Sequence, residues 1–330
     1  MKLSLSELEL IHALQIAPRA SWKDLGEVLG VHPVTVAERW AQIRAAGHAW
    51  VTGYRGFSPT NGALAFVGLQ CAHGTRDAVL ERMCAISQVS HVEETTRNWD
   101  FRLTVMANDW HEISHTVFPQ VRQDPDVVRT HLAVATRNIA LGHEWRLDVL
   151  DPAQERRLKA LHPVTPRDSA PIPHLDQMLP LLAQNGRVSA AEVAEAIGVH
   201  PTTAARYIRL ALETGALVIR CELAQQYSGY PVACEWWARV PAGELAEAEK
   251  YLQSFRSLRL AAVTTGDANL NFYIWLRHLA EIEEVELGLQ RAAPGTQILE
   301  SEIGVRTHKR MGWRLGPDTT ATGEFTIPRR

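Results

Sequence analysis

The chain repeats one pattern of apolar and polar positions at an offset of 168 residues. Residues 21–47 and 189–215 align without a gap, and both contain the run Gly-Val-His-Pro, at 30–33 and 198–201. In each copy the apolar positions recur every three or four residues, which is typical of one face of an amphipathic helix. Two identical tetrapeptides inside matching hydrophobic patterns indicate an internal repeat, so the architecture is expected to be duplicated.

Each copy predicts two short helices joined by a tight turn. Ser21 and Ser189 precede the first helix, where a hydroxyl can accept a hydrogen bond from a free amide of the first turn. Gly30 follows that helix, at a position where left-handed backbone is least costly for glycine. Pro33 suits the first turn of the next helix, because its missing N–H leaves nothing unsatisfied there. The result is a predicted helix-turn-helix, a motif whose second helix enters the major groove of DNA.

A second pattern follows each helix pair and also occurs twice. Strands are expected in the first half at 63–71, 89–96, 101–107 and 127–139, with helices at 75–86 and 109–121. The same order returns with strands at 231–240, 258–265, 269–276 and 296–306, and helices at 244–255 and 279–289. The order βαββαβ predicts a ferredoxin-like fold, in which two helices cover one face of an antiparallel sheet.

The two patterns alternate along the chain. We therefore expect an α+β protein in which two winged helix-turn-helix domains alternate with two ferredoxin-like βαββαβ domains. Apolar runs at 49–54 and 216–223 are the predicted wing or linker strands. The expected boundaries are 1–54 and 174–223 for the helix-turn-helix domains, 55–149 and 224–315 for the ferredoxin-like domains, 150–173 for a linker, and 316–330 for a loose tail.

Composition limits the function classes. A chain of 330 residues with 46% hydrophobic and 22% charged residues suits a soluble protein of several domains. It has no apolar run of membrane-spanning length, no secretory signal at its start, and four scattered cysteines, so we expect a cytoplasmic protein with no membrane partner. The net charge of −3 permits DNA binding, because phosphate contacts need only a local basic face.

These motifs resemble the Lrp/AsnC (feast/famine) family of transcription regulators. The resemblance rests on the two Gly-Val-His-Pro-x-Thr turns, on Thr264-Thr265-Gly266-Asp267, and on Lys309-Arg310-x-Gly312-Trp313. It implies a helix-turn-helix joined to a βαββαβ domain that senses a small ligand and forms oligomers. This chain would be a tandem double-length form that supplies both members of the usual pair, and we expect it to associate further into a dimer or tetramer.

Residues on the outer face of each predicted recognition helix are the candidates for contact with double-stranded DNA. Val36, Trp40 and Ile43 are expected to face the core of the first domain. The remaining candidates are Val34, Thr35, Glu38, Arg39 and Gln42 in the first helix, and Thr202, Thr203, Arg206, Tyr207 and Arg209 in the second. Arginine can bind guanine with two hydrogen bonds, and threonine and glutamine can contact base edges or phosphates. An ordinary solvated face is the alternative interpretation.

Gly266, Asp267 and Asn269 are the candidates for effector binding. The family resemblance implies an amino acid or related metabolite as the effector, whereas the residues themselves equally suit a tight hairpin turn. The first half has Arg97-Asn98-Trp99-Asp100 at the corresponding position, so effector binding by its sensor domain stays open.

Nothing in the spacing of polar residues indicates a catalytic site, a cofactor or a metal. His32 and His200 lie in turns without partners at ligand spacing, so capping of the following helix is the expected role. We therefore expect a protein that is not an enzyme. The alternative is a siroheme decarboxylase, a tetrapyrrole enzyme of similar architecture, for which His91, Arg97 and Arg102 are the candidates in the first half.

Overall fold

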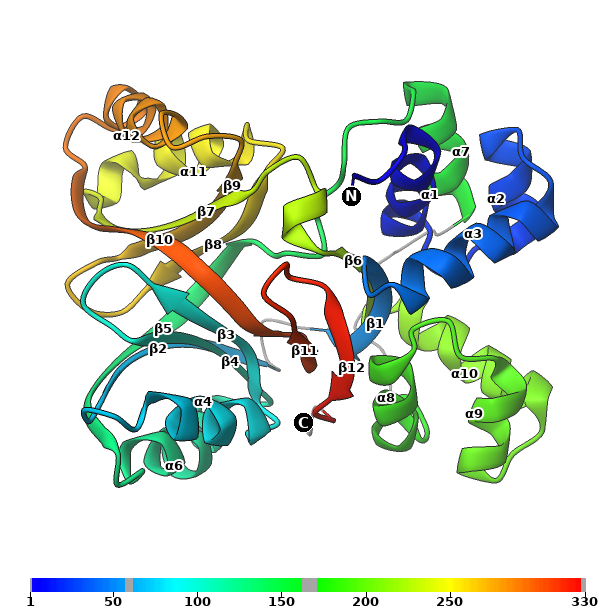
Figure 1. Ribbon diagram of the computed structural model, residues 1–330, viewed down its shortest axis with the longest axis horizontal. Coiled ribbons are helices and arrows are strands. Elements are labelled where there is room, and N and C mark those ends of the chain that lie inside the picture. Colours follow the sequence, from blue (N-terminus) through cyan, green and yellow to red (C-terminus); the bar gives the residue numbers. More distant parts are fainter. Residues whose placement is uncertain (1, 57–61, 162–170, 328–330) are drawn as a thin grey trace.

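The computed structural model describes residues 2–56, 62–161 and 171–327, which form a helical module beside a sheet module (Figure 1). Each half of the helical module has three helices followed by one strand. The first half contains α1 (Leu5–Ile16), α2 (Trp22–Leu29), α3 (Pro33–Ala45) and β1 (Ala49–Arg55). The second contains α8 (Leu175–Gln184), α9 (Ala190–Ile197), α10 (Pro201–Glu213) and β6 (Leu217–Leu223).

Local interactions set the ends of these helices as the sequence predicts. The Ser21 hydroxyl accepts from the Asp24 amide at 3.1 Å, and Ser189 caps α9 in the same way. Gly30 ends α2 with a φ of 66°, in the left-handed region. His32 Nδ1 accepts from the Val34 amide at 3.4 Å, so its expected capping role is confirmed.

The two helical halves share one hydrophobic core. Strands β1 and β6 pair antiparallel from Ala49↔Leu223 to Arg55↔Leu217, forming a two-stranded ribbon, and buried residues of all six helices join the same cluster. Two arginines also cross reciprocally between the halves. Arg19 donates to the carbonyls of Gly186 and Val188, and Arg187 donates to those of Pro18 and Ala20. The predicted recognition helices α3 and α10 are therefore held in one unit.

The sheet module repeats one order of elements. Its first half contains β2 (Ala63–Cys71), α4 (Arg76–Ala85), β3 (Val89–Thr95), β4 (Phe101–Ala107), α5 (Trp110–Glu112), a π-helical turn (Ile113–Val117), α6 (Phe118–Arg122) and β5 (Val127–Ala140). Its second half contains β7 (Val232–Arg239), α11 (Leu245–Gln253), β8 (Leu258–Thr264), β9 (Leu270–Leu276), α12 (Glu281–Ala292) and β10 (Gln297–Arg310). Short 3₁₀ turns at Gln225–Tyr227 and Ala242–Glu244 flank β7.

The eight long strands close into a single antiparallel barrel, and this differs from the two separate sheets that the sequence predicts. Their order is β3-β4-β2-β5-β8-β9-β7-β10, and β10 pairs with β3 to complete the circle. The reason lies in β5 and β10, which have 14 residues each. Each pairs along part of its length within its own half and then extends to pair with the other half, for example at Arg310↔His91. Closure leaves neither half with an exposed edge.

Helices cover the outside of the barrel. In Figure 1, α4 and α6 lie on one side and α11 and α12 on the other, and each pair packs over its own hydrophobic cluster. A smaller apolar cluster that includes Phe66, Trp237 and Met311 lies between the two halves. Among the described residues, no helix combines the length and apolarity needed to cross a membrane.

The predicted linker and tail both contain regular structure. Helix α7 (Pro152–Leu161) packs against α1 and α2 and buries Leu158, so this part of the expected linker belongs to the helical module; residues 162–170 lie outside the described residues. The C-terminal stretch is not a loose tail up to residue 327. Strand β12 (Ala321–Phe325) pairs with β11 (Trp313–Leu315), and the Ala321 amide donates to the Gly47 carbonyl at 2.9 Å. Residues 328–330 lie outside the described residues.

Candidate functional site

A chamber lies within the barrel and is bordered at one end by the β1–β6 ribbon. Its lining comes from both halves of the sheet module, with Tyr54 of β1 and Arg220 of β6 added by the ribbon. The space between its walls is about 900 Å³, including the part open to solvent. Much of the wall is apolar, from Leu64, Phe66, Met106, Leu141, Leu260, Trp275 and Met311.

Three arginines gather at the ribbon end of the chamber. Arg220 and Arg259 both form ion pairs with Glu222, and the contact from Arg259 Nη2 to Glu222 Oε2 is 3.1 Å. Burial raises the pKa of Glu222, but these guanidinium groups outweigh it and hold that pKa at about 2. Burial also lowers the pKa of Arg259 to about 9. The third, Arg310, lies 4.9 Å from the centre of the Trp275 ring and donates to Thr307 Oγ1 at 3.3 Å.

Proton-binding groups line the middle of the chamber. His91 on β3 shares a hydrogen bond with Ser90 through Nδ1, and burial followed by the charge of Arg310 keeps its pKa well below 6.5, so the imidazole is neutral at neutral pH. Glu93 accepts hydrogen bonds from Tyr273 at 2.7 Å and from Thr307 at 3.1 Å, and burial raises its pKa. Burial also raises the pKa of Glu235 to about 7, against the opposing charge of Arg102.

Two tryptophans and Arg102 fill the other end of the barrel. The Arg102 guanidinium lies over Trp99 and Trp237, 5.6 and 4.9 Å from their ring centres, and forms ion pairs with Glu300 and Glu302 at 2.8 Å each. Trp99 packs so closely on Gly68 that a Cβ there would lie 2.6 Å from the indole. This end is therefore occupied by protein side chains, and the ribbon end offers the space for a ligand.

The polar lining does not follow the repeat of the fold. Residues of the second half's sheet correspond to those of the first at an offset of 169, because β2 begins at Ala63 and β7 at Val232. Arg310 therefore corresponds to Leu141, and Arg102 to Asn271. The backbone around the chamber repeats, but the side chains at corresponding positions differ in charge. In each of these pairs only one half supplies a charge, which favours one orientation of a bound ligand.

Both predicted recognition helices have their outer faces open. Val36, Trp40 and Ile43 are buried, as predicted. The exposed DNA candidates are Val34, Thr35, Glu38, Gln42, Thr202, Arg206 and Arg209, while Arg39, Thr203 and Tyr207 are half-buried. Arg39 Nη1 reaches the Ser6 carbonyl at 3.5 Å, and Arg209 forms an ion pair with Glu213. DNA contact by these residues stays a prediction.

The predicted effector residues form a hairpin turn between β8 and β9 and do not line the chamber. The Asn269 side chain bonds both the amide and the carbonyl of Val240 at 2.8 Å, and Arg239 donates to the carbonyls of Gly266 and Asp267. A turn role accounts for these contacts without a ligand.

Of the three decarboxylase candidates, His91 and Arg102 border the chamber, whereas Arg97 is exposed and does not line it. Sequence reasoning missed Arg220 and Arg259, and it named Arg310 only as part of the Lys309-Arg310-x-Gly312-Trp313 motif. The available signal was a charge inside an apolar strand, which holds for Arg259 in 258–264 and, together with Glu222, for Arg220 in 217–223, but not for Arg310, whose strand is polar.

Comparisons with known proteins agree with these two modules. Residues 8–44 match the AsnC-type helix-turn-helix domain, and residues 64–143 match the Lrp/AsnC ligand binding domain. No curated protein sequence matches the chain.

Among solved structures, the siroheme decarboxylase NirDL is similar over 92% of each chain, at 13% identity and a TM-score of 0.59. The same enzyme in complex with an iron-uroporphyrin III analogue covers the same shares at 12% identity and 0.60. AsnC from E. coli covers 43% of this chain and 97% of its own, at 19% identity and 0.36.

The matched domains support a DNA-binding transcriptional regulator, as the sequence predicts. The expectation that the chain is not an enzyme is contradicted. A siroheme decarboxylase shares the fold over 92% of both chains, so this architecture is compatible with catalysis. The sequence suggested this enzyme only as an alternative, because the chamber is lined by residues of both halves and cannot be recognised in either half alone.

Proposed function

We propose that this chain is a ligand-controlled DNA-binding regulator whose ligand lies in the barrel chamber, at a distance from the turn that contains Gly266. Residues 174–223 would form a second helix-turn-helix domain and 224–315 a second ferredoxin-like domain, which makes the chain a tandem double-length form. The repeated order of elements and the matching strand orders β3-β4-β2-β5 and β8-β9-β7-β10 support this duplication.

One observation carries the proposal: the ribbon that borders the chamber also connects the recognition helices. Strand β1 follows α3 after three residues, and β6 follows α10 at the same interval. Tyr54 and Arg220 line the chamber, while Val51 and Ile219 of the same strands pack in the core of the helical module. A ligand that contacts Arg220 would therefore displace both helices through the ribbon strands that follow them.

The effect of such a ligand would be to shift the helical module as a unit. The shared core and the reciprocal contacts of Arg19 and Arg187 oppose a change in the spacing between α3 and α10. An effector changes DNA affinity only by its differential affinity for the free and the DNA-bound arrangements. Double-stranded DNA and a small anionic molecule are the partners we propose, with assembly into a dimer or tetramer.

The test compares ligand control in two variants after operator sequences have been obtained by in vitro selection from random DNA. Iron-uroporphyrin III serves as the probe ligand, and DNA affinity is measured with and without it. Leu141→Trp fills the chamber and is expected to abolish the response. Asp267→Ala alters the exposed turn and is expected to preserve it. Loss of the response in Asp267→Ala alone would instead locate the effector at the turn, and failure to select any DNA would reject the regulator.

A second candidate function is removal of CO₂ from a carboxylated tetrapyrrole in the same chamber. Its support is the fold similarity to a siroheme decarboxylase together with the lining itself. Apolar walls suit a flat ring system, and the arginines suit its peripheral carboxylates. Loss of CO₂ leaves a carbon that must take up a proton, and Glu235 can supply one because its pKa is raised to about 7.

This candidate is checked with purified protein and siroheme. Decarboxylation in deuterated water is expected to give a product that lacks CO₂ and gains one deuterium for each carboxyl removed, as measured by mass spectrometry. Glu235→Gln is expected to slow turnover while leaving binding intact. An unchanged siroheme mass with bound siroheme would leave the chamber as a sensor site and reject the enzyme.

A further inference from the structure

The ribbon end of the chamber contains more buried positive than negative charge. Arg220, Arg259 and Arg310 have 6%, 6% and 2% of their surfaces exposed, and Glu222 has none. Glu222 is the single carboxylate that forms an ion pair with any of these arginines among the described residues. Three guanidinium groups and one carboxylate leave two net positive charges, and Arg310 is the one of the three arginines without an ion pair among the described residues.

Unpaired buried charge is costly, because the protein interior does not solvate it as water does. Proteins retain such an arrangement where a bound counter-charge completes it. Here the excess is two positive charges on the side of the cluster that borders the chamber, since all three arginines line it. Glu93 also lines the chamber and interacts with the charge of Arg310, but it is hydrogen-bonded to Tyr273 and Thr307 and forms no ion pair among the described residues.

The guanidinium groups are also held in fixed positions. Arg259 and Arg310 both lie over the Trp275 ring, 4.2 and 4.9 Å from its centre. The backbone of Gly142 runs directly beside Arg220, so that a Cβ at that position would lie 2.8 Å from Arg220 Nη1. Arg220 Nε is buried and has no hydrogen-bond partner. Donors that are already oriented and unsatisfied bind an acceptor with little loss of side-chain entropy.

We propose that Arg220, Arg259 and Arg310 form a subsite for two carboxylate groups of the ligand, arranged around Glu222. This subsite identifies the chemical class of the ligand in the chamber. It rests on the proposed function in one respect, namely that the ligand lies in the chamber. Carboxylates match because each can accept two parallel hydrogen bonds from a guanidinium fork. Two sources present this chemistry, a small dicarboxylic acid and the edge of a carboxylated tetrapyrrole.

The first test measures binding to the full-length protein by calorimetry at constant ionic strength. The probes are succinate, glutarate and iron-uroporphyrin III, with acetate, chloride and inorganic phosphate for comparison. A dicarboxylate or the tetrapyrrole is expected to bind at least tenfold more tightly than acetate. Binding of succinate or glutarate identifies a small dicarboxylic acid as sufficient, whereas binding of iron-uroporphyrin III alone identifies the tetrapyrrole. Equal affinities for acetate and all other probes would overturn the subsite, as would binding of inorganic phosphate in preference to every carboxylate.

Substitutions provide a test in which affinity and stability move in opposite directions. Arg310→Gln removes the one arginine of the three that has no ion pair among the described residues, so the ligand-free protein is expected to unfold at a higher temperature while its affinity for the probe falls about tenfold or more. Glu222→Gln removes the single counter-charge, so the ligand-free protein is expected to melt earlier and the probe to bind more tightly. Arg137→Gln, an exposed arginine paired with Glu249, is the matched control and is expected to change neither property.

The subsite is overturned if Arg310→Gln binds the probe as the unaltered protein does, or if it lowers stability and affinity together. A different outcome would reject the regulator but keep the subsite. In that outcome the dicarboxylate binds and Arg310→Gln weakens its binding as expected, but no DNA is selected. Binding that survives Arg310→Gln yet is lost in Leu141→Trp overturns the subsite and leaves the chamber as the ligand site.

Discussion

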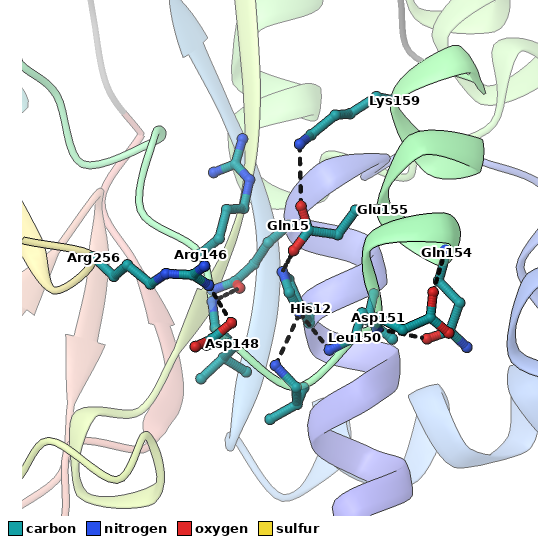
Figure 2. A network of polar contacts seen from close by, with 12 residues as sticks. His12, Gln15, Arg146, Asp148, Leu150, Asp151, Gln154, Glu155, Lys159 and Arg256 are labelled. Atoms are coloured by element: carbon teal, nitrogen blue, oxygen red, sulfur yellow. Dashed lines mark hydrogen bonds and ion pairs between the residues drawn. The ribbon is translucent and has the colours of Figure 1, made fainter. Parts of the chain in front are cut away.

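His12 shows how single residues tie the end of the barrel to the helical module. Its ring is fully buried in α1, and Nδ1 accepts from the amides of Val149 and Leu150 at 3.4 and 3.2 Å (Figure 2). The proton of the neutral ring is therefore on Nε2, which lies 3.9 Å from Glu155 of α7. Nearby charges come from Arg146, Asp148 and Arg256, but burial is the main effect and lowers the pKa of His12 to about 4.

This shift predicts loss of stability in mild acid. The unfolded chain takes up a proton at His12 near pH 6.5, whereas the folded protein does so only near pH 4. Between those values the unfolded state binds more protons, so stability falls as the pH is lowered. The contribution of His12 is about 3 kcal/mol at the acid end of that window. His12→Gln should reduce the slope of unfolding free energy against pH, measured by urea denaturation from pH 7 to pH 4.5.

A control separates this effect from a general response to acid. His73→Gln changes an exposed histidine and is expected to retain the full slope. His91 and His143 are partly buried, and burial lowers the pKa of each, so part of the slope should persist in His12→Gln. An identical slope in His12→Gln and the unaltered protein would contradict the assignment.

Residue-level sequence reasoning succeeded where the cause is local. Ser21, Gly30 and His32 act on backbone groups within a few residues, and the structure confirms each role. It failed for Arg220 and Arg310, which are 90 positions apart and meet only after the barrel has closed. In the linear sequence, Arg220 interrupts an apolar strand, whereas Arg310 is one member of a polar run.

At the scale of elements, DNA contact is predicted for the outer faces of α3 and α10. Arg206 in α10 is exposed, and Arg39 in α3 is half-buried, with its Nη1 3.5 Å from the Ser6 carbonyl. We predict that Arg39→Ala and Arg206→Ala each weaken binding to a selected operator and lower its salt dependence by about one unit of log K against log salt, because each removes one phosphate partner. The measurement is a fluorescence-anisotropy titration at several salt concentrations.

Arg137→Ala, on the outside of the barrel, is the control for overall charge in that titration and is expected to leave the slope unchanged. If the slopes of both helix variants equal that of the control, the assignment of α3 and α10 as DNA-reading helices is wrong.

The elements themselves could largely be predicted, but their pairing could not. The expected strand at 127–139 is β5 to within one residue, and that at 296–306 is β10 apart from its last four residues. Those last four matter, because Arg310 pairs with His91 across the halves. Hydrophobic alternation shows which face of a strand is buried, but a strand that leaves one sheet for another keeps the same alternation.

At the scale of the whole molecule, the two halves of the chain form two fused units where the sequence suggests four separate domains. The helical halves share one core, and the sheet halves share one barrel. Ion pairs made by one arginine join the two halves of the barrel. Arg102 of the first half contacts Glu235, Glu300 and Glu302, all of the second half, and the first two of these contacts measure 3.9 and 2.8 Å.

This complementarity predicts how the chain behaves when it is divided between residues 161 and 171. The second half alone would bring two copies of Glu235 and Glu302 into one barrel without Arg102, together with six arginines at the ribbon end, so its self-association should be disfavoured by buried like charges. Mixed halves are therefore expected to form a one-to-one complex, measured by native mass spectrometry. Arg102→Met in the first half should weaken that complex, whereas Arg82→Met, whose partners Asp124 and Asp126 lie in the same half, should not. If the second half pairs with itself as readily as with the first, strand edges alone determine the assembly, and the charges of the barrel interior do not.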